Sequence, residues 1–419
     1  MKINSLKKVL CIVYSTIVLF IASCDMSSTK NYLTAEQQKT IASVKPVNGT
    51  SNAACEINYT ADYKLDDFIN CITDNKIVTA EGSRLMMKKL IADGSNLRPL
   101  ERLTNSAPGC SSVICKSPEG YSLLGRNYDL DIRSNGAIVV IHTMPAGGYK
   151  SVGIADCGQC GLSKSKVTDS VKKELLLYAP YFTMDGVNEK GFACSIMLLN
   201  EGGCVQDNGK KYLPSTLVVR YLLDKADSVD NAVELLKNID FKRQYFIDGV
   251  PDEYLSFHWA LTDKTGNKAI IEYVNGNMIV NKFPVKVKYN ETTDDFDSFE
   301  YPEKETGYLI STNFFVSKGF TNTKHDSGKW RYETIDNLMS KISTPTKDQL
   351  RDVMKAVKYF QNDKDYLFEL KQQGKDVEKT ENWDWITLWT DILDTQNLTL
   401  SLWINEDYQT QNDFEIAYK

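Results

Sequence analysis

Histidine is scarce in this sequence, since a chain of 419 residues has only His142, His258 and His325. A catalytic cysteine–histidine pair, or a zinc site that uses histidine, is therefore hard to build. Basic residues are also too few for a positive surface, because 49 Lys and Arg face 55 Asp and Glu, and the formal net charge is −6. That balance argues against a nucleic-acid-binding protein.

A hydrophobic run long enough to cross a membrane is lacking as well. The longest apolar stretch, residues 9–23, is shorter than a spanning helix, which needs about 20 residues. It follows a lysine-rich start and ends in "IASC", as a signal peptide does. The ending resembles a bacterial lipobox, which predicts that residues 1–24 are a lipoprotein signal peptide and that Cys24 carries lipid. The alternative is an ordinary cleavage site with an incidental cysteine. Lipidation predicts a protein anchored outside the cytoplasm in the bacterial cell envelope, in the periplasm or at the outer membrane.

The ten cysteines include one CxxC, formed by Cys157 and Cys160. Since no second CxxC accompanies it and histidine is scarce, we expect no metal site. A local disulfide and two packed thiols remain the alternatives for this pair. His258 lies in an alternating strand pattern, which favours a packed, structural histidine.

Composition divides the rest of the chain into three parts. Residues 25–58 are polar and aperiodic, which predicts a flexible tether. Residues 59–109 form a pro-segment or small chain with two helical patterns. Residues 110–419 form the main domain.

Strand and helix patterns alternate in blocks along the main domain. Strands are predicted at 110–117, 121–127, 136–144, 149–156, 192–200, 257–281 and 307–315, helices at 213–226, 228–239, 328–342 and 346–360, and a closing hairpin at 385–407. Residues 288–306 are acidic and are expected to form a loop. The order predicts an α+β domain with helices on the outer faces of antiparallel sheets.

The Gly109-Cys110 pair opens the first of these strands. Cys110 is either one buried sulfur among several or a nucleophile hidden in a precursor. Cleavage of the Gly109–Cys110 bond would free an α-amine, with an ordinary pKa of about 8, that can take the thiol proton. Arg126 would stabilise the thiolate, and Asp129 would hold the amine. Cys115 is an odd number of residues away, so it faces the opposite side of the strand.

Residues 110–131 resemble the mature start of cysteine N-terminal-nucleophile (Ntn) amidases of the linear amide C-N hydrolase, or choloylglycine hydrolase, family. This group includes bile salt hydrolases, penicillin V acylases and acid ceramidase. The spacing from Cys110 to Gly120, Arg126, Asn127 and Asp129 matches the family's Cys…Gly…Gly-Arg-Asn-x-Asp. Further stretches resemble the family in the expected order, at 184–200, 214–239, 257–273, 311–315 and 330–339.

The resemblance implies a four-layer αββα sandwich, with two antiparallel sheets between helical layers. It implies hydrolysis of a linear amide in an N-acyl small molecule, without metal or organic cofactor. Cys110 would be the nucleophile, with Arg126 and Asp129 as its partners. Asn313 matches the asparagine that helps to hold the oxyanion, and Arg331 matches a second arginine near the nucleophile.

The assignment of the remaining oxyanion-binding residue of the family to this sequence is less direct. A gapless count from Asn188 gives Leu198, whose side chain has no donor. Asn200 is therefore the candidate, because a shift of two residues keeps the same face of a strand.

Two features depart from the bile salt hydrolase pattern. A long stretch of chain separates Cys24 from Cys110, which resembles relatives that cut themselves into two chains. The segment between Asn313 and Arg331 is short by comparison with those enzymes, which leaves bile-salt specificity and a homo-oligomeric state open. An acyltransferase of the acyl-CoA:penicillin acyltransferase type and a non-catalytic binding lipoprotein with the same fold are the alternative functions.

Overall fold

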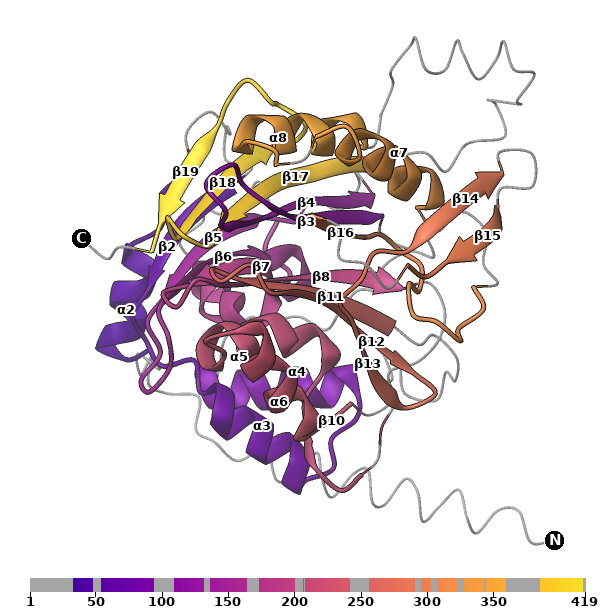
Figure 1. Ribbon diagram of the computed structural model, residues 1–419. Coiled ribbons are helices and arrows are strands. Elements are labelled where there is room, and N and C mark those ends of the chain that lie inside the picture. Colours follow the sequence, from indigo (N-terminus) through magenta and orange to yellow (C-terminus); the bar gives the residue numbers. More distant parts are fainter. Residues whose placement is uncertain are drawn as a thin grey trace, which may run out of the picture. The chain divides into compact units, whose positions relative to one another are not determined.

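Two β-sheets form the centre of the computed structural model, with helices on their outer sides (Figure 1). The elements described below belong to the unit formed by Ala35–Lys419, and Met1–Thr34 form a separate unit. The structure describes residues 33–47, 54–93, 109–131, 136–163, 173–199, 206, 208–241, 256–290, 295–302, 307–322, 328–342, 344–358 and 385–416. The predicted lipidation site Cys24 and the candidate Asn200 lie outside these residues.

The smaller sheet contains the predicted nucleophile and is antiparallel throughout. Its order is β16 (Tyr308–Ser311), β3 (Cys110–Lys116), β4 (Ser122–Asp131), β17 (Trp385–Asp394), β18 (Thr399–Ile404) and β19 (Asn412–Glu415). Gly120, with φ +93°, makes the turn between β3 and β4, a conformation that glycine adopts without strain. The predicted first and last hairpins are therefore confirmed.

The larger sheet has nine strands and faces the smaller one. Its order is β1 (Lys45–Pro46), β2 (Ala54–Tyr59), β5 (Ile138–Thr143), β6 (Ser151–Asp156), β7 (Thr183–Asn188), β8 (Phe192–Leu199), β11 (Ser256–Asp263), β12 (Lys268–Val274) and β13 (Asn277–Asn281). Neighbours are antiparallel except β2 and β5, which pair in parallel. The expectation of purely antiparallel sheets is thus wrong at this one pair.

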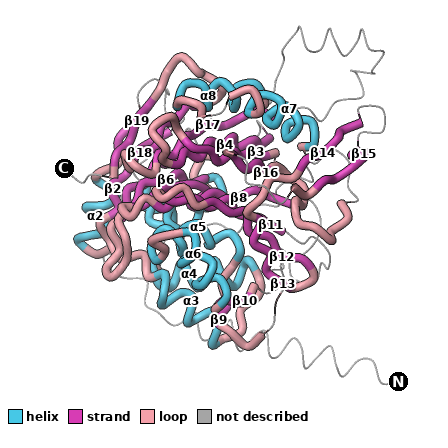
Figure 2. The backbone as a smooth tube through the Cα atoms, in the orientation of Figure 1, coloured by secondary structure: helices cyan, strands magenta, loops and turns pink. Residues whose placement is uncertain are grey.

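Helices cover both outer faces (Figure 2). The smaller sheet is covered by α7 (Lys329–Met339) and α8 (Lys347–Ala356), and the larger one by α3 (Leu65–Asp74), α4 (Ala80–Ile91), α5 (Val218–Lys225) and α6 (Val229–Lys237). Shorter elements are α2 (Ala35–Ala42), η1 (Cys157–Cys160), η3 (Lys173–Phe182), η4 (Ser215–Leu217) and the paired strands β9 (Lys211–Tyr212) and β10 (Ile239–Asp240). The predicted α+β fold with four layers is confirmed.

Local sequence explains where several helices begin. The Ser228 side chain accepts a hydrogen bond from the Asn231 backbone at the start of α6. Thr346 and Gln349 form a reciprocal capping box at the start of α8, which satisfies backbone groups that a helix leaves unpaired.

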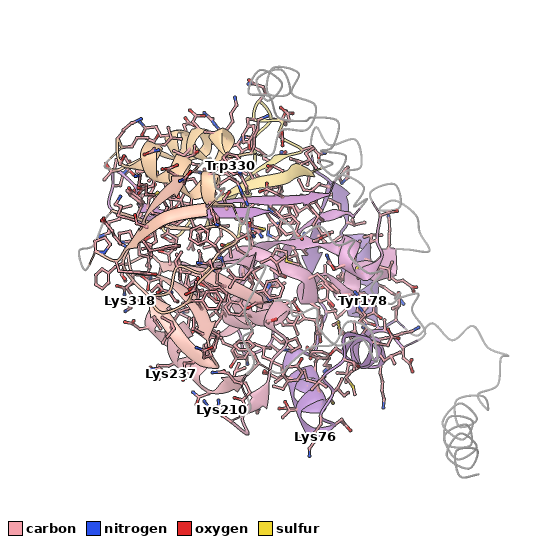
Figure 3. All side chains as sticks on the ribbon, turned by 90° about the vertical axis from the view of Figure 1, so that its right-hand side faces the viewer. Lys76, Tyr178, Lys210, Lys237, Lys318 and Trp330 are labelled. Carbon is pink, nitrogen blue, oxygen red and sulfur yellow. The ribbon has the colours of Figure 1, made fainter. Side chains whose placement is uncertain are left out.

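The core between the smaller sheet and its helices shows why Cys110 and Cys115 differ. Cys115 belongs to an apolar cluster that includes residues of α7 and α8, such as Ile335 and Leu350. Side chains fill the interior of the unit, and Trp330 of α7 packs against this cluster (Figure 3). Alternation along β3 turns Cys110 to the opposite face, as the sequence predicts.

Two sequence expectations are wrong. The tether predicted for residues 25–58 contains α2 and β2, and β2 is an interior strand of the larger sheet. The loop predicted at 288–306 contains most of a hairpin of β14 (Lys286–Asn290) and β15 (Asp295–Glu300). In that region the Phe299 ring packs edge-on against Phe314, a contact that the acidic composition concealed.

Two further observations concern membrane and redox chemistry. Among the described residues, no helix has the length and hydropathy needed to span a membrane. Cys157 and Cys160 are buried free thiols, and the Cys160 thiol contacts the Cys157 carbonyl at 3.1 Å. Of the two alternatives for this pair, the structure has packed thiols.

The segment before Cys110 is expected to remain bound if the chain is cut at Gly109–Cys110. Strand β2 pairs with β5 along its whole length, and the Tyr63 hydroxyl donates to Asp224 of α5 at 2.7 Å. Size-exclusion chromatography should therefore give one peak that contains both pieces, which separate in denaturant. If the chain stays whole, a protease site inserted between residues 94 and 108 supplies the break. Loss of the small piece under native conditions would contradict this expectation.

Candidate active site

Cys110 is the first residue of β3 and is 2% exposed. In the hairpin register, Cys110 lies opposite Tyr128, and Ser112 lies opposite Arg126. Directly opposed residues point to the same face of a sheet, so the Arg126 side chain shares the inner face with Cys110. The distance from Arg126 Nη2 to Cys110 Sγ is 3.4 Å.

The Arg126 guanidinium is fixed by groups from three strands. It donates to the Asp185 carboxylate of β7 and, over 2.7 Å, to the Ile196 carbonyl of β8. Its carbon lies 4.6 Å from the Tyr128 ring centre, and the Tyr128 ring stacks on Trp389 of β17. Burial raises the pKa of Asp185 to about 6, and Arg126 opposes that shift. The arginine is therefore held as a fully buried cation beside the thiol.

Asp129 and Arg331 form a second ion pair behind Cys110. Arg331 Nη1 donates to Asp129 Oδ2 at 3.0 Å, and the Thr387 hydroxyl donates to Asp129 Oδ1 at 2.6 Å. The Asp129 backbone nitrogen donates to the Gly109 carbonyl oxygen at 2.8 Å. Burial raises the pKa of the Asp129 carboxyl to about 7, with Arg331 opposing. The carboxyl can therefore bind or release a proton near neutral pH.

Asn313 connects the nucleophile to the second arginine. Its Oδ1 accepts from the Cys110 backbone nitrogen at 2.8 Å and from Arg331 Nη2 at 2.7 Å. Its Nδ2 donates to the Leu198 carbonyl at 2.7 Å. Because an amide nitrogen carries two hydrogens, Nδ2 has one hydrogen left for a second acceptor.

Opposing effects act on the Cys110 thiol. Burial raises its pKa, and the charges of Arg126 and Arg331 lower it, whereas the Asp129 carboxylate raises it. Arg126 approaches from the face toward the larger sheet, and Arg331 comes from α7 on the other face. A thiolate formed here would be stabilised by two cations.

The structure brings five of the predicted residues together: Cys110, Arg126, Asp129, Asn313 and Arg331. Leu198, the position reached by the gapless count from Asn188, also lies at the site, where its backbone carbonyl accepts from Asn313 Nδ2. Sequence reasoning missed Asp185, Thr387 and Trp389. Asp185 lies in a stretch that resembles the family, but no pattern there distinguished it, and nothing in the closing hairpin distinguished Thr387.

Asp391 is a further buried carboxyl next to this cluster. It is opposite Arg126 in the β4–β17 register and is 0% exposed. Burial and the neighbouring Asp185 raise its pKa well above the ordinary value. The residues described here include no group of three or more His, Cys, Asp or Glu arranged to hold a metal ion.

A substitution at Gly328 tests how closely the surrounding atoms confine the Arg331 side chain. The φ of Gly328 is +76°, and an added Cβ would lie 2.5 Å from Arg331 Nη2. Gly328→Ala should lower the free energy of unfolding by about 1–2 kcal/mol for the backbone and by about 1–3 kcal/mol more for the overlap. Gly209→Ala is the matched control, because Gly209 has φ +74° and open space around it. Equal losses in denaturant melts of the two variants would show that Arg331 is not confined.

Residues 110–303 match the family described as linear amide C-N hydrolases, choloylglycine hydrolase family. The chain is 33% identical over 104 residues to a penicillin V acylase of Pectobacterium atrosepticum, covering 23% of this chain and 27% of that protein. It is 24% identical over 196 residues to a bile salt hydrolase/transferase of Clostridium perfringens, covering 45% and 55%. The matches thus span about a quarter and about half of these relatives.

Solved structures give weaker similarity. A variant of conjugated bile acid hydrolase from Clostridium perfringens aligns with TM-score 0.46 and 14% identity over 73% of this chain and 92% of that one. Penicillin V acylase from Agrobacterium tumefaciens aligns with TM-score 0.43 and 13% identity, over 73% and 84%. The family resemblance inferred from the motifs is confirmed by the family match.

Proposed function

Residues 110–303 match the choloylglycine hydrolase family of linear amide C-N hydrolases, and from this premise we propose that the chain hydrolyses the amide bond of an N-acyl small molecule. Cys110 is the nucleophile. The observation that carries the proposal is the convergence on Cys110: Arg126 lies beside the sulfur, and Asn313 Oδ1 lies beside the backbone nitrogen.

The reaction uses only groups of the chain and water. The Cys110 sulfur attacks the carbonyl carbon of the substrate, and the α-amine takes the thiol proton. The Asn313 Nδ2 hydrogen stabilises the tetrahedral oxyanion, a type of bond worth roughly 3 kcal/mol. The C–N bond then breaks, the α-amine passes its proton to the leaving amine, and water hydrolyses the thioester.

The proposal requires that the Gly109–Cys110 bond is first cut, because the nitrogen of Cys110 is otherwise part of a peptide bond. Two contacts support self-cleavage. The Gly109 carbonyl oxygen accepts from the Asp129 backbone nitrogen at 2.8 Å, and the Cys110 nitrogen donates to Asn313. Attack of the Cys110 sulfur on the Gly109 carbonyl carbon would give a thioester and free the α-amine. Water would then release Gly109 as a carboxylate.

The comparisons support a substrate class. The relatives' names refer to penicillin V and to bile salts, and the matched family is described as linear amide C-N hydrolases. The word transferase in one of these names keeps acyl transfer as the second candidate, in which an amine replaces water as the acceptor. Adding free amines to the assay below distinguishes the two.

Cys110→Ala should abolish both cleavage and turnover. We expect the wild-type intact mass to show two pieces divided at 109/110, and the variant to stay whole. Hydrolysis of a panel of N-acyl substrates should fall on the order of 10³-fold or more, because the variant lacks the sulfur that forms the thioester. Mass spectrometry and amine release measure the two effects.

Cys115→Ala is the matched control, because Cys115 is an equally buried thiol on the other face of β3. It should cut itself and turn over substrate like the wild type. If Cys110→Ala hydrolyses the panel at the parental rate, the mechanism is wrong. A wild-type chain that stays whole and hydrolyses nothing supports the binding lipoprotein instead.

We further propose that Cys24 is lipidated and anchors the protein outside the cytoplasm. The support is the "IASC" ending after a short apolar run. Protein expressed in a bacterial host should partition into the detergent phase and carry added lipid mass, whereas Cys24→Ala should stay in the aqueous phase. Cys11→Ala, a second cysteine in the same stretch, should behave like the wild type. A Cys24→Ala protein that still partitions into detergent rejects the anchor.

A further inference from the structure

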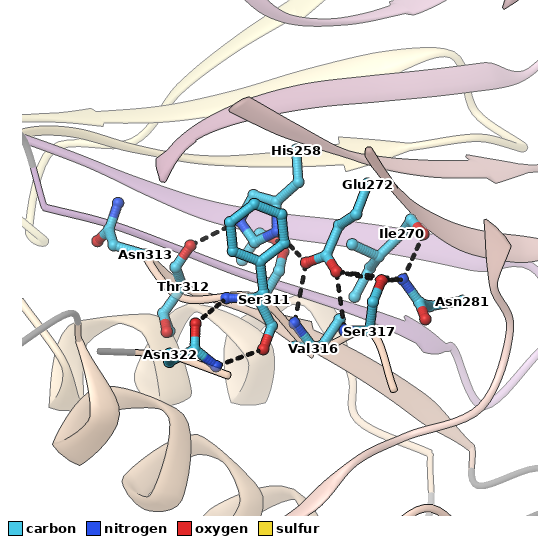
Figure 4. A network of polar contacts seen from close by, with 12 residues as sticks. His258, Ile270, Glu272, Asn281, Ser311, Thr312, Asn313, Val316, Ser317 and Asn322 are labelled. Atoms are coloured by element: carbon cyan, nitrogen blue, oxygen red, sulfur yellow. Dashed lines mark hydrogen bonds and ion pairs between the residues drawn. The ribbon is translucent and has the colours of Figure 1, made fainter. Parts of the chain in front are cut away.

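A buried polar network lies beside the candidate active site (Figure 4). His258 of β11 is 0% exposed, and both ring nitrogens have acceptor partners. Nδ1 lies 2.9 Å from Glu272 Oε1, and Nε2 lies 2.7 Å from the Thr312 carbonyl oxygen. The carbonyl can only accept, so Nε2 carries a hydrogen.

Glu272 of β12 accepts from several donors besides the ring. Its Oε1 accepts from the Val316 backbone nitrogen at 2.9 Å, and its Oε2 accepts from the Ser317 backbone nitrogen at 2.8 Å. The Ser317 hydroxyl also donates to Oε2, and Asn281 Nδ2 lies 3.5 Å from that oxygen. Backbone N–H groups on both oxygens favour the ionised carboxylate. We therefore expect the hydrogen between His258 and Glu272 to lie on Nδ1, so that the ring donates from both nitrogens.

The two residues hold the chain on both sides of Asn313. His258 fixes the carbonyl of Thr312, the residue immediately before it, and Glu272 fixes the backbone nitrogens of Val316 and Ser317. Asn313 in turn presents Oδ1 to the Cys110 nitrogen. The segment 312–317 is thus tied to the larger sheet, while Asn313 contacts the first residue of β3 in the smaller one.

We propose that His258, paired with Glu272, is a positioning residue that orients Asn313 against Cys110 through the Thr312 carbonyl. This inference rests on the proposed function, in which Asn313 acts during bond breaking. Stability alone explains the pair poorly, because a buried ion pair is often no more stable than packed apolar groups of similar volume. His258 fixes the Thr312 carbonyl, which is one residue before the catalytic side-chain amide of Asn313. The pair can therefore set the position of that amide.

Two substitutions of His258 distinguish the contributions of its two ring nitrogens. A glutamine nitrogen overlays Nε2 and can still donate to Thr312, whereas an asparagine nitrogen overlays Nδ1 and cannot reach it. His258→Asn should lower kcat about 10- to 100-fold, as expected for a misplaced catalytic group, with KM within about 2-fold because Asn313 acts in the transition state. His258→Gln should retain kcat within about 3-fold. Thermal melts of both variants check that the folded fractions are comparable.

Equal kcat values for the two variants, after correction for the folded fraction, would overturn the proposal. So would a loss confined to KM or to stability. A second readout needs no substrate: nitrogen NMR of histidine-labelled protein is simple because the chain has three histidines. Signals of a ring that carries hydrogens on both nitrogens, present in the wild type and missing from His258→Gln, would support the His258–Glu272 pair. A His258 ring that carries a hydrogen on only one nitrogen would refute the pair. This spectrum separates failure of the pair from failure of the proposed hydrolase activity.

Discussion

The hydrogen bond from the Cys110 nitrogen to Asn313 Oδ1 is the contact on which the rest of the site depends. It follows from the pairing of β16 with β3, in which Ser311 lies opposite Ser112. Continuing that register by two residues puts Asn313 beside Cys110. A slip of one residue would turn Asn313 to the other face. The sheet register therefore determines whether the nucleophile has its partner.

Charge pairing offsets the cost of placing these charged side chains in the buried interior. Arg126 pairs with Asp185, and Arg331 pairs with Asp129, all fully buried. An unpaired charge at such depth would cost several kcal/mol. The pairs come from different layers, since Asp185 lies on the larger sheet and Arg331 on the outer helix α7. The ion pairs thus join three of the four layers at the nucleophile.

The sequence pattern predicted the part of the site that lies on neighbouring strands of one hairpin. Cys110, Arg126 and Asp129 lie on one hairpin, so strand spacing alone could bring them together. Asn313 and Arg331 came only from the family resemblance, because a contact between distant parts of the chain leaves no periodicity in the sequence. Asp185 was missed for the same reason. Strand β2 was missed because its partner β5 follows only after the whole first hairpin of the smaller sheet, and the polar residues around β2 resemble a linker.

The contacts of the histidine side chains bear on which group can act as the base for the Cys110 thiol. His258 is engaged at both ring nitrogens, and His142 contacts Glu56 of β2 at 3.0 Å, away from the Cys110 contacts. The contacts described for these two rings do not involve the Cys110 sulfur, and His325 lies outside the described residues. The proposed function therefore assigns the thiol proton to the α-amine of Cys110. The nitrogen of Cys110 belongs to the same residue as the thiol, and it already faces an acceptor in Asn313. A free α-amine at this position would keep Asn313 Oδ1 as its hydrogen-bond acceptor.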